Sequence, residues 1–323
     1  MNLIGDHTDY TGGLVLPMAI DRGITIEYIA GDDTIELRSD ADAEPVRLAV
    51  PFGGDPSAVT PRWGTYVAAM ARELAVDRGI AGHVTSTIPA GAGLSSSAAL
   101  ECAVGLALGF DGDATELALT ARRAEHAATH VPTGIMDQLC IAAATDGHAT
   151  MIDCDTLEIA PVAVPTNVDV VVEFVAHRTL VGSAYADRVA ECARAESVVG
   201  PLRNASPADV ERAQSLLDDI AWRRARHVVH ENERVRSFAT ALTGGDFSAA
   251  GALMTASHES LRTDFETSTP TMDAAVDRLV RSDGVFGARM TGAGFGGCVV
   301  ALCERGAIGS GWVVHASAGV HRC

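Results

Sequence analysis

The stretch from Ile88 to Leu100 is the feature that most restricts how this chain can fold. A β-prone run, residues 83–88, leads into Pro89, two glycines and three consecutive serines, after which an Ala/Leu-rich segment begins. Proline ends a strand, and glycine allows backbone conformations that a Cβ would obstruct. Serine caps helices, and the first turn of a helix presents unpaired N–H groups and a partial positive charge. Strand, glycine loop and serine-capped helix therefore predict a phosphate cradle, for which a tight turn capped by serine is the alternative.

The basic residues of the chain exclude several classes of phosphate-handling protein. All 24 of them are arginine, and none of the 323 residues is lysine. A P-loop, a protein kinase and a pyridoxal enzyme each need a lysine at a defined place. The cradle is therefore not a P-loop, and its phosphate contacts must come from backbone amides with help from a divalent cation.

Size and charge narrow the possible partners. A chain of this length predicts about two domains, and its net charge of −18 argues against binding nucleic acid or an anionic membrane. The N-terminus has no basic region followed by an apolar run, and the apolar segments are too short or too interrupted to span a bilayer. Seven cysteines without a CxxC pair indicate reduced thiols. We expect a cytoplasmic protein.

A polar loop lies near the N-terminus. Asp6, His7, Asp9 and Tyr10 crowd hydrogen-bonding groups between an apolar entry and the turn Gly12–Gly13. A loop closed by an Asx-turn would explain such residues. Two carboxylates around a histidine also suit a polyol, whose hydroxyls donate to aspartate and accept from imidazole. Metal binding fits less well, because nothing nearby completes a ligand set.

Two further carboxylates are candidates for chemistry. Glu125 lies on a predicted helix over residues 117–129, from which it could reach a Mg²⁺ ion held by a serine of the cradle. Asp137 lies at the head of the next predicted helix, residues 139–144. There its negative charge would stabilise the helix by about 0.5–1 kcal/mol through the helix dipole. Alternatively, it would face a transferable phosphoryl group and a substrate hydroxyl.

The second half of the chain reads as mainly helical and ends in a second glycine cluster. Its composition predicts helices over residues 179–199, 207–230 and 231–242. The second glycine loop, residues 291–297, has four glycines in six positions and runs into an apolar strand. Such a run indicates backbone close to another group, or a buried bulge.

Four of these segments resemble the signature motifs of galactokinases, a branch of the GHMP small-molecule kinase superfamily. They are Asn2–Tyr10, Pro89–Leu100, Gly134–Gln138 and Thr291–Gly297. The segments Ser183–Tyr185, Arg226–Val229 and Ser257–Leu261 are similar as well. The resemblance covers nearly the whole chain with the motifs in the right order.

The resemblance implies an α+β fold with two lobes and an active site in the cleft between them. An N-terminal lobe of the ribosomal-protein-S5-like type would span residues 1–165, and a ferredoxin-like lobe residues 166–323. The boundary follows two predicted strands, residues 148–153 and 162–164.

The resemblance also implies an activity, the transfer of the ATP γ-phosphoryl group to the C1 hydroxyl of D-galactose. Asp137 matches the catalytic aspartate, and Ser97 and Glu125 match the Mg²⁺ positions. The sugar-binding positions are matched by Asp6, His7, Asp9, Gly134 and Tyr185. The nucleotide-binding loop is matched by Pro89, Gly91, Ala92, Gly93, Leu94, Ser95, Ser96 and Ser97. The second glycine loop matches the family's third motif, which supports the phosphate loop. The partners would be ATP and a small sugar, and the protein would be a monomer.

This chain departs from the family pattern in three places. The family's catalytic arginine would lie one position before Met1, so either the chain starts upstream or it lacks that arginine. Asp6 stands where the family has glutamate, one methylene longer, which loosens the prediction of which sugar is bound. After Leu302 a family helix is mostly missing. A kinase for a related sugar and a non-catalytic sugar and nucleotide sensor of the same fold are the alternatives.

Overall fold

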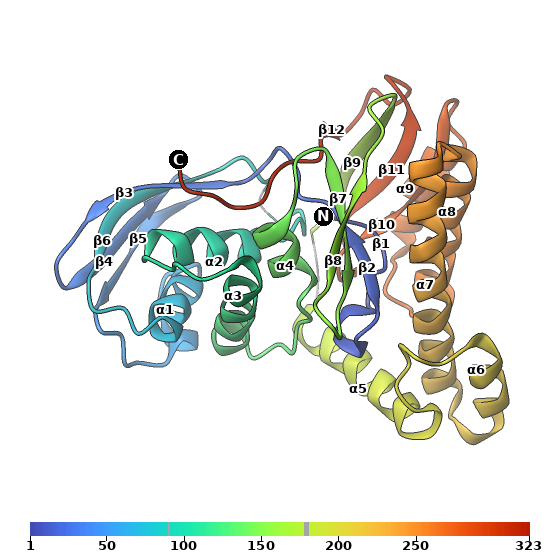
Figure 1. Ribbon diagram of the computed structural model, residues 1–323, viewed down its shortest axis with the longest axis horizontal. Helices are drawn as coiled ribbons and strands as arrows, with labels where there is room; N and C mark the ends of the chain where they lie inside the picture. Colours follow the sequence, from blue (N-terminus) through green and yellow to red (C-terminus); the bar gives the residue numbers. More distant parts are fainter. Residues whose placement is uncertain (90, 178–180) are drawn as a thin grey trace. The chain divides into compact units, whose positions relative to one another are not determined.

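A computed structural model describes residues 1–89, 91–177 and 181–323 (Figure 1). Ala90 of the glycine loop lies outside these residues, as do Thr179 and Leu180, where the sequence predicts the start of a helix. The chain packs as two compact units. The larger unit comprises residues 1–21, 91–94 and 145–317, and the smaller unit comprises residues 22–90, 95–144 and 318–323.

The smaller unit is a four-stranded sheet with four helices. The strand order is β3-β6-β4-β5, with β4 parallel to β6 and the other pairs antiparallel. The strands are β3 (Ile24–Ala30), β4 (Thr34–Ser39), β5 (Asp42–Ala49) and β6 (Ile80–Ser86). The helices are α1 (Gly64–Glu73), α2 (Ser96–Ala107), α3 (Ala114–Thr129) and α4 (Met136–Ala143). Fully buried residues of β4, α1 and α2, such as Leu37, Met70 and Val104, form its core.

The larger unit contains two four-stranded sheets and the remaining helices. One sheet has the order β1-β2-β7-β8, and the other has the order β10-β11-β9-β12. The first consists of β1 (Asn2–Ile4), β2 (Leu14–Pro17), β7 (His148–Asp153) and β8 (Ile159–Ala163). The second consists of β9 (Val168–Ala176), β10 (Val285–Thr291), β11 (Gly297–Glu304) and β12 (Trp312–Val314). The helices are α5 (Val181–Val199), α6 (Pro207–Ala213), α7 (Asp219–Gly244), α8 (Phe247–Thr263) and α9 (Pro270–Val280).

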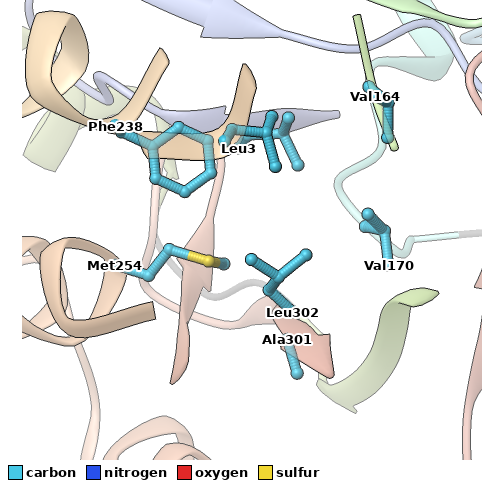
Figure 2. A pocket seen from close by; sticks show the side chains of 8 residues that line it. Leu3, Val164, Val170, Phe238, Met254, Ala301 and Leu302 are labelled. Atoms are coloured by element: carbon cyan, nitrogen blue, oxygen red, sulfur yellow. The ribbon is translucent and has the colours of Figure 1, made fainter. Parts of the chain in front are cut away.

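Strand β11 is a deeply buried strand of the larger unit. Seven of its eight residues are buried, as the apolar run after the second glycine loop predicts. Helix α8 packs against α7 on one side and β10 on the other (Figure 1). Leu3, Phe238 and Met254 line a small apolar pocket in this unit that leaves no room for a water molecule (Figure 2). The pocket therefore belongs to the core and offers no ligand site.

The helix boundaries differ from the sequence prediction most in one region, whereas α3 and α4 each begin three residues earlier than predicted. Residues 207–230 do not form one helix, because the chain is extended at Leu217 and Asp218 starts a new helix by accepting the N–H of Ala221 at 2.8 Å. That helix, α7, runs through the predicted break between His230 and Glu231. Neither glycine nor proline stands there to end it, so continuous hydrogen bonding prevails.

The packing units also cut the chain differently from the 1–165 and 166–323 lobes. Residues 1–21 and 145–165 pack with the C-terminal half, because β1 and β2 contact helix α7 while β7 and β8 complete their sheet. In the part of the chain that the structure describes, no helix is both long enough and apolar enough to span a membrane.

Candidate functional site

The polar loop, residues 6–10, lies between β1 and β2 of the larger unit and is shaped by backbone close to other backbone. Gly5 has φ +99°, and a Cβ there would lie 2.8 Å from the carbonyl oxygen of Leu14. His7 adopts φ 66°, a left-handed conformation that is unusual outside glycine. Such strain persists only where the surrounding structure enforces it, and it is common at binding sites.

Aromatic side chains surround His7. Its Nδ1 lies 3.2 Å from the Tyr10 hydroxyl, and its Nε2 lies 3.2 Å from the carbonyl oxygen of Ala293. Because a carbonyl only accepts, Nε2 carries the proton and Nδ1 accepts from Tyr10. The His7 ring centroid is 5.6 Å from that of Tyr185 and 4.7 Å from that of Phe265. The structure thus brings His7 and Tyr185 together as the motif predicts, and adds Tyr10 and Phe265.

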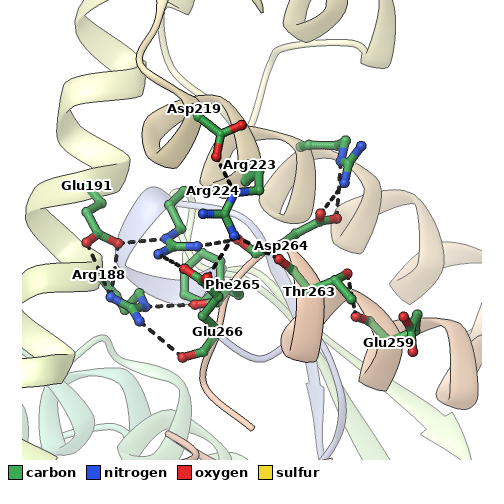
Figure 3. Close-up of polar contacts among 11 residues, drawn as sticks. Arg188, Glu191, Asp219, Arg223, Arg224, Glu259, Thr263, Asp264, Phe265 and Glu266 are labelled. Carbon is green, nitrogen blue, oxygen red and sulfur yellow. Dashed lines mark hydrogen bonds and ion pairs between the residues drawn. The ribbon is translucent and has the colours of Figure 1, made fainter.

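A dense arginine–carboxylate network holds Phe265 in place (Figure 3). Arg188 of α5 donates from Nε to the Phe265 carbonyl oxygen at 2.7 Å, and Arg224 of α7 lies over the ring, 5.7 Å from its centroid. Arg224 is 1% exposed and is neutralised by Glu191 at 2.6 Å and Glu266 at 2.7 Å. Burying a charge is costly unless it is paired, so this network fixes the ring that His7 contacts.

Three buried side chains of helix α7 form hydrogen bonds with the backbone of the polar loop and of the residues that flank it. His227 Nε2 lies 3.1 Å from the Asp6 carbonyl oxygen, while Glu231 accepts the Gly5 N–H at 3.0 Å and Asn232 accepts the Leu14 N–H at 2.7 Å. Residues 227 and 231 are one turn apart on the same face of the helix, and Asn232 follows directly after Glu231. The backbone on both sides of the loop is therefore fixed by one rigid element.

Two of these side chains have strongly shifted pKa values. Burial lowers the pKa of His227 to about 4, so the ring is neutral at physiological pH. Burial raises the pKa of Glu231, but Arg234, His227 and Arg289 outweigh it and lower that pKa to about 2. Glu231 is thus ionised under all ordinary conditions.

Asp6 is buried in the larger unit. Its carboxylate is 1% exposed and forms an ion pair with Arg289 at 2.6 Å. Asp9, in contrast, is half-buried at the start of a 3₁₀ turn over residues 9–11. Of the larger unit's predicted sugar contacts, Asp6, His7 and Tyr185 are thus buried, and Asp9 is half-buried.

The predicted nucleotide-binding loop, residues 89–97, is called the glycine–serine loop below. It does not show the serine cap that the sequence predicts. Ser95 stands at the N-cap of α2, but no side-chain cap bond forms among the residues the structure describes. The reason is its left-handed backbone, φ 58° and ψ 37°, whereas a capping serine has an extended one. Gly91 and Gly93 adopt φ +70° just before it. The N–H groups of the first turn of α2 are therefore free of the predicted serine cap, which leaves them available to an anion.

Ser97 and Glu125 meet within the smaller unit. Ser97 Oγ donates to Glu125 Oε1 at 2.9 Å, although the two residues are 28 positions apart. Thr133 Oγ1 and Gln138 Nε2 both donate to the other carboxylate oxygen at 2.8 Å. These bonds orient the Glu125 carboxylate as supporting groups orient metal ligands.

The oxygen atoms of Ser97 and Glu125 suit Mg²⁺, which prefers oxygen ligands and keeps several waters or phosphates. Within the described ranges, no group of three histidine, cysteine or acidic side chains forms a metal site.

Glu101 is a second buried carboxylate close to Glu125. Gln138 Nε2 also lies 3.3 Å from Glu101 Oε2, and burial, followed by the charge of Glu125, raises the pKa of Glu101 well above its usual value. Burial and the neighbouring charge therefore both favour the protonated form of Glu101.

Asp137 and Gly134 lie at the start of α4 in the smaller unit. Asp137 is half-buried in the first turn, and Gly134 is buried just before the helix. A carboxylate in that turn is favoured by the helix dipole whether or not it reacts. Asp137 belongs to the smaller unit with Ser97 and Glu125, whereas the polar loop belongs to the larger one.

Sequence reasoning missed three residues of the site, namely Arg289, Glu231 and Phe265. Arg289 was visible only as one charged residue beside the second glycine loop, and Glu231 as one of many charges on a helix. Both are 0% exposed. A charged residue at an otherwise apolar position of a strand or helix is the signal that could have identified them.

Comparison with known proteins identifies the class. Residues 64–145 match the family model "GHMP kinases N terminal domain", and residues 238–310 match "GHMP kinases C terminal". Solved mevalonate kinases share the fold, one at a TM-score of 0.65 and 20% identity over 95% of this chain and 90% of its own. The chain is a GHMP kinase.

The branch of that class follows from closer relatives. Residues 1–28 match the "Galactokinase galactose-binding signature". Galactokinase of Homo sapiens is 38% identical over 95% of this chain and 82% of its own, and that of Chloroflexus aurantiacus is 40% identical over 94% and 81%. Lactococcus lactis galactokinase, solved complexed with galactose, matches at a TM-score of 0.92 and 31% identity over 98% of this chain and 92% of its own. The chain belongs to the galactokinase family.

Proposed function

We propose that this protein transfers the γ-phosphoryl group of Mg²⁺-bound ATP to the C1 hydroxyl of D-galactose, forming galactose 1-phosphate. The observation that carries the proposal is the match of residues 1–28 to the galactose-binding signature. The Lactococcus lactis relative complexed with galactose and the ring cluster of His7, Tyr10 and Tyr185 support it.

Each group has a role in this proposal. Asp137 orients or deprotonates the C1 hydroxyl, while His7, Asp9, Gly134 and Tyr185 bind the sugar. Backbone N–H groups of residues 91–97 bind the phosphates. Mg²⁺ neutralises phosphate charge, and Ser97 and Glu125 provide the protein's oxygen ligands. Phosphoryl transfer depends on positioning and charge stabilisation more than on covalent chemistry, which suits such a set of residues.

The test is product formation from a panel of sugars. Purified protein with ATP and Mg²⁺ should release ADP with galactose and yield galactose 1-phosphate by ³¹P NMR. Faster turnover of another sugar would identify that sugar, and not galactose, as the preferred substrate. Binding of galactose and ATP without release of ADP would instead support a sensor.

A further inference from the structure

The Asp6 carboxylate is buried inside the larger unit, where Oδ1 has a hydrogen bond and Oδ2 has an ion pair but, among the described residues, no hydrogen bond. One oxygen, Oδ1, accepts the N–H of Gly292 at 3.1 Å, and the other, Oδ2, lies 2.6 Å from Arg289 Nη2. The residue is 1% exposed, whereas the neighbouring Asp9 is half-buried. A carboxylate that binds a sugar hydroxyl needs an oxygen that the sugar can approach. Asp6 presents none.

Arg289 explains why Asp6 stays in place. The guanidinium is 0% exposed, donates from Nη1 to the Leu3 carbonyl oxygen at 3.2 Å, and lies 3.9 Å from Glu231 Oε1. Asp6 is its nearest carboxylate partner. Because a buried cation without its partner is strongly destabilising, turning Asp6 toward a ligand would be opposed by Arg289.

The contacts of Asp6 join the polar loop to the second glycine loop. Beside the Asp6–Gly292 bond, His7 Nε2 contacts the Ala293 carbonyl oxygen, and Thr291 Oγ1 donates to the Asn2 carbonyl oxygen at 2.8 Å. These interactions set the position of the backbone that carries His7.

We propose that Asp6 is a positioning residue, which links the polar loop to Arg289 and the second glycine loop and does not itself bind a sugar hydroxyl. The inference rests on the proposed function, because it concerns how the same sugar site is built. It separates Asp6 from Asp9, the carboxylate we assign to the sugar.

Deoxy sugars distinguish the two roles. Calorimetry would give dissociation constants for galactose and its 2-, 3-, 4- and 6-deoxy analogues with wild type, Asp6→Asn and the matched Asp9→Asn. We expect Asp6→Asn to weaken binding of all five sugars by a similar factor of about 10. Asp9→Asn should instead lose discrimination against one analogue, the one that lacks its hydroxyl partner. Selective loss of discrimination against a single analogue in Asp6→Asn would overturn the proposal.

A rescue variant tests the ion pair directly. Asp6→Asn combined with Arg289→Gln neutralises both partners, so the double variant should recover melting temperature and galactose affinity relative to Asp6→Asn alone. A carboxylate that binds the sugar would not be rescued by changing Arg289, so the absence of rescue contradicts the proposal. Failure of both Asp6→Asn and the double variant to fold would also contradict the proposal. Failure of wild type to bind or phosphorylate galactose would reject the proposed function, while melting-temperature rescue would still support the positioning role.

Discussion

The polar loop and the glycine–serine loop share left-handed backbone but differ in their side-chain support. Positive φ occurs at Gly5 and His7 in and beside the polar loop, and at Gly91, Gly93 and Ser95 in the glycine–serine loop. The polar loop is in addition held by buried side chains: those of α7 at 227, 231 and 232 bind its backbone, and Arg289 pairs with Asp6. A sugar is recognised by a definite arrangement of hydroxyl partners, whereas phosphate is recognised by any cluster of N–H groups. In the function we propose, the polar loop binds the sugar and therefore needs the more rigid support.

The largest expected effect lies outside both loops. Asp137→Asn should lower kcat by about 10³-fold, because the variant cannot take the proton or offer negative charge to the C1 hydroxyl. Galactose affinity should change little, because we assign sugar binding chiefly to other residues. Steady-state kinetics and calorimetry test this, with Asp146→Asn on an exposed turn as the matched control. A wild-type kcat in Asp137→Asn would refute the catalytic assignment.

The comparison predicts that stability depends on the support of the polar loop. Glu231→Leu leaves Arg289 and Arg234 without their shared carboxylate and should lower the free energy of unfolding by about 3–5 kcal/mol. Glu233→Gln changes an exposed residue two positions further along the same helix. This variant should change the free energy of unfolding by less than about 0.5 kcal/mol. Denaturant unfolding measures both. Equal effects would mean that the Glu231 network does not support the fold.

The neutral His227 predicts acid sensitivity. The pKa of its folded form, about 4, lies below the ordinary value of 6.5, so at pH 5 the unfolded chain binds a proton that the folded protein does not. Stability should therefore fall as pH drops from 6.5 to 4, and this group contributes about 3 kcal/mol to the loss.

The variant His227→Gln should remove the share of that dependence that His227 contributes, while His258, whose pKa burial also lowers to about 4, keeps its own share. The variant's melting temperature, measured between pH 4 and 7, should vary less than that of wild type, while the exposed His321→Gln serves as the control. A wild-type slope in His227→Gln would show that other groups control acid unfolding.

The smallest effect is expected at the phosphate side. Glu125→Gln removes the charge and leaves one acceptor oxygen, for either Ser97 or the donors Thr133 and Gln138, and should raise the KM for Mg²⁺·ATP by about 10-fold. The KM for galactose should stay within about twofold, because the polar loop is untouched. A magnesium titration at fixed ATP measures the effect, with Glu158→Gln as an exposed control. A shift in galactose KM alone would contradict the division between the two regions.

Local patterns in the sequence predicted much of the chain. Strand β7 begins and ends where expected, and Glu125 reaches Ser97 as the helix prediction suggested. The errors arise where local preference competes with wider context. Ser95 takes a left-handed conformation and does not cap α2, and α7 continues through residues 230–231. Neither outcome can be read from residue type alone, because serine and charged residues tolerate several conformations.

The sequence by itself determined the family and the motifs, since these reside in short runs of residues with defined spacing. Only the tertiary structure decided which of the motif's polar groups are available to a ligand. Asp6 and Asp9 are both aspartates of one loop, yet Asp6 is paired with Arg289, 283 positions later, and Asp9 is half-buried. Desolvation and ion pairing depend on what surrounds a side chain in space, and the chain order does not encode that directly.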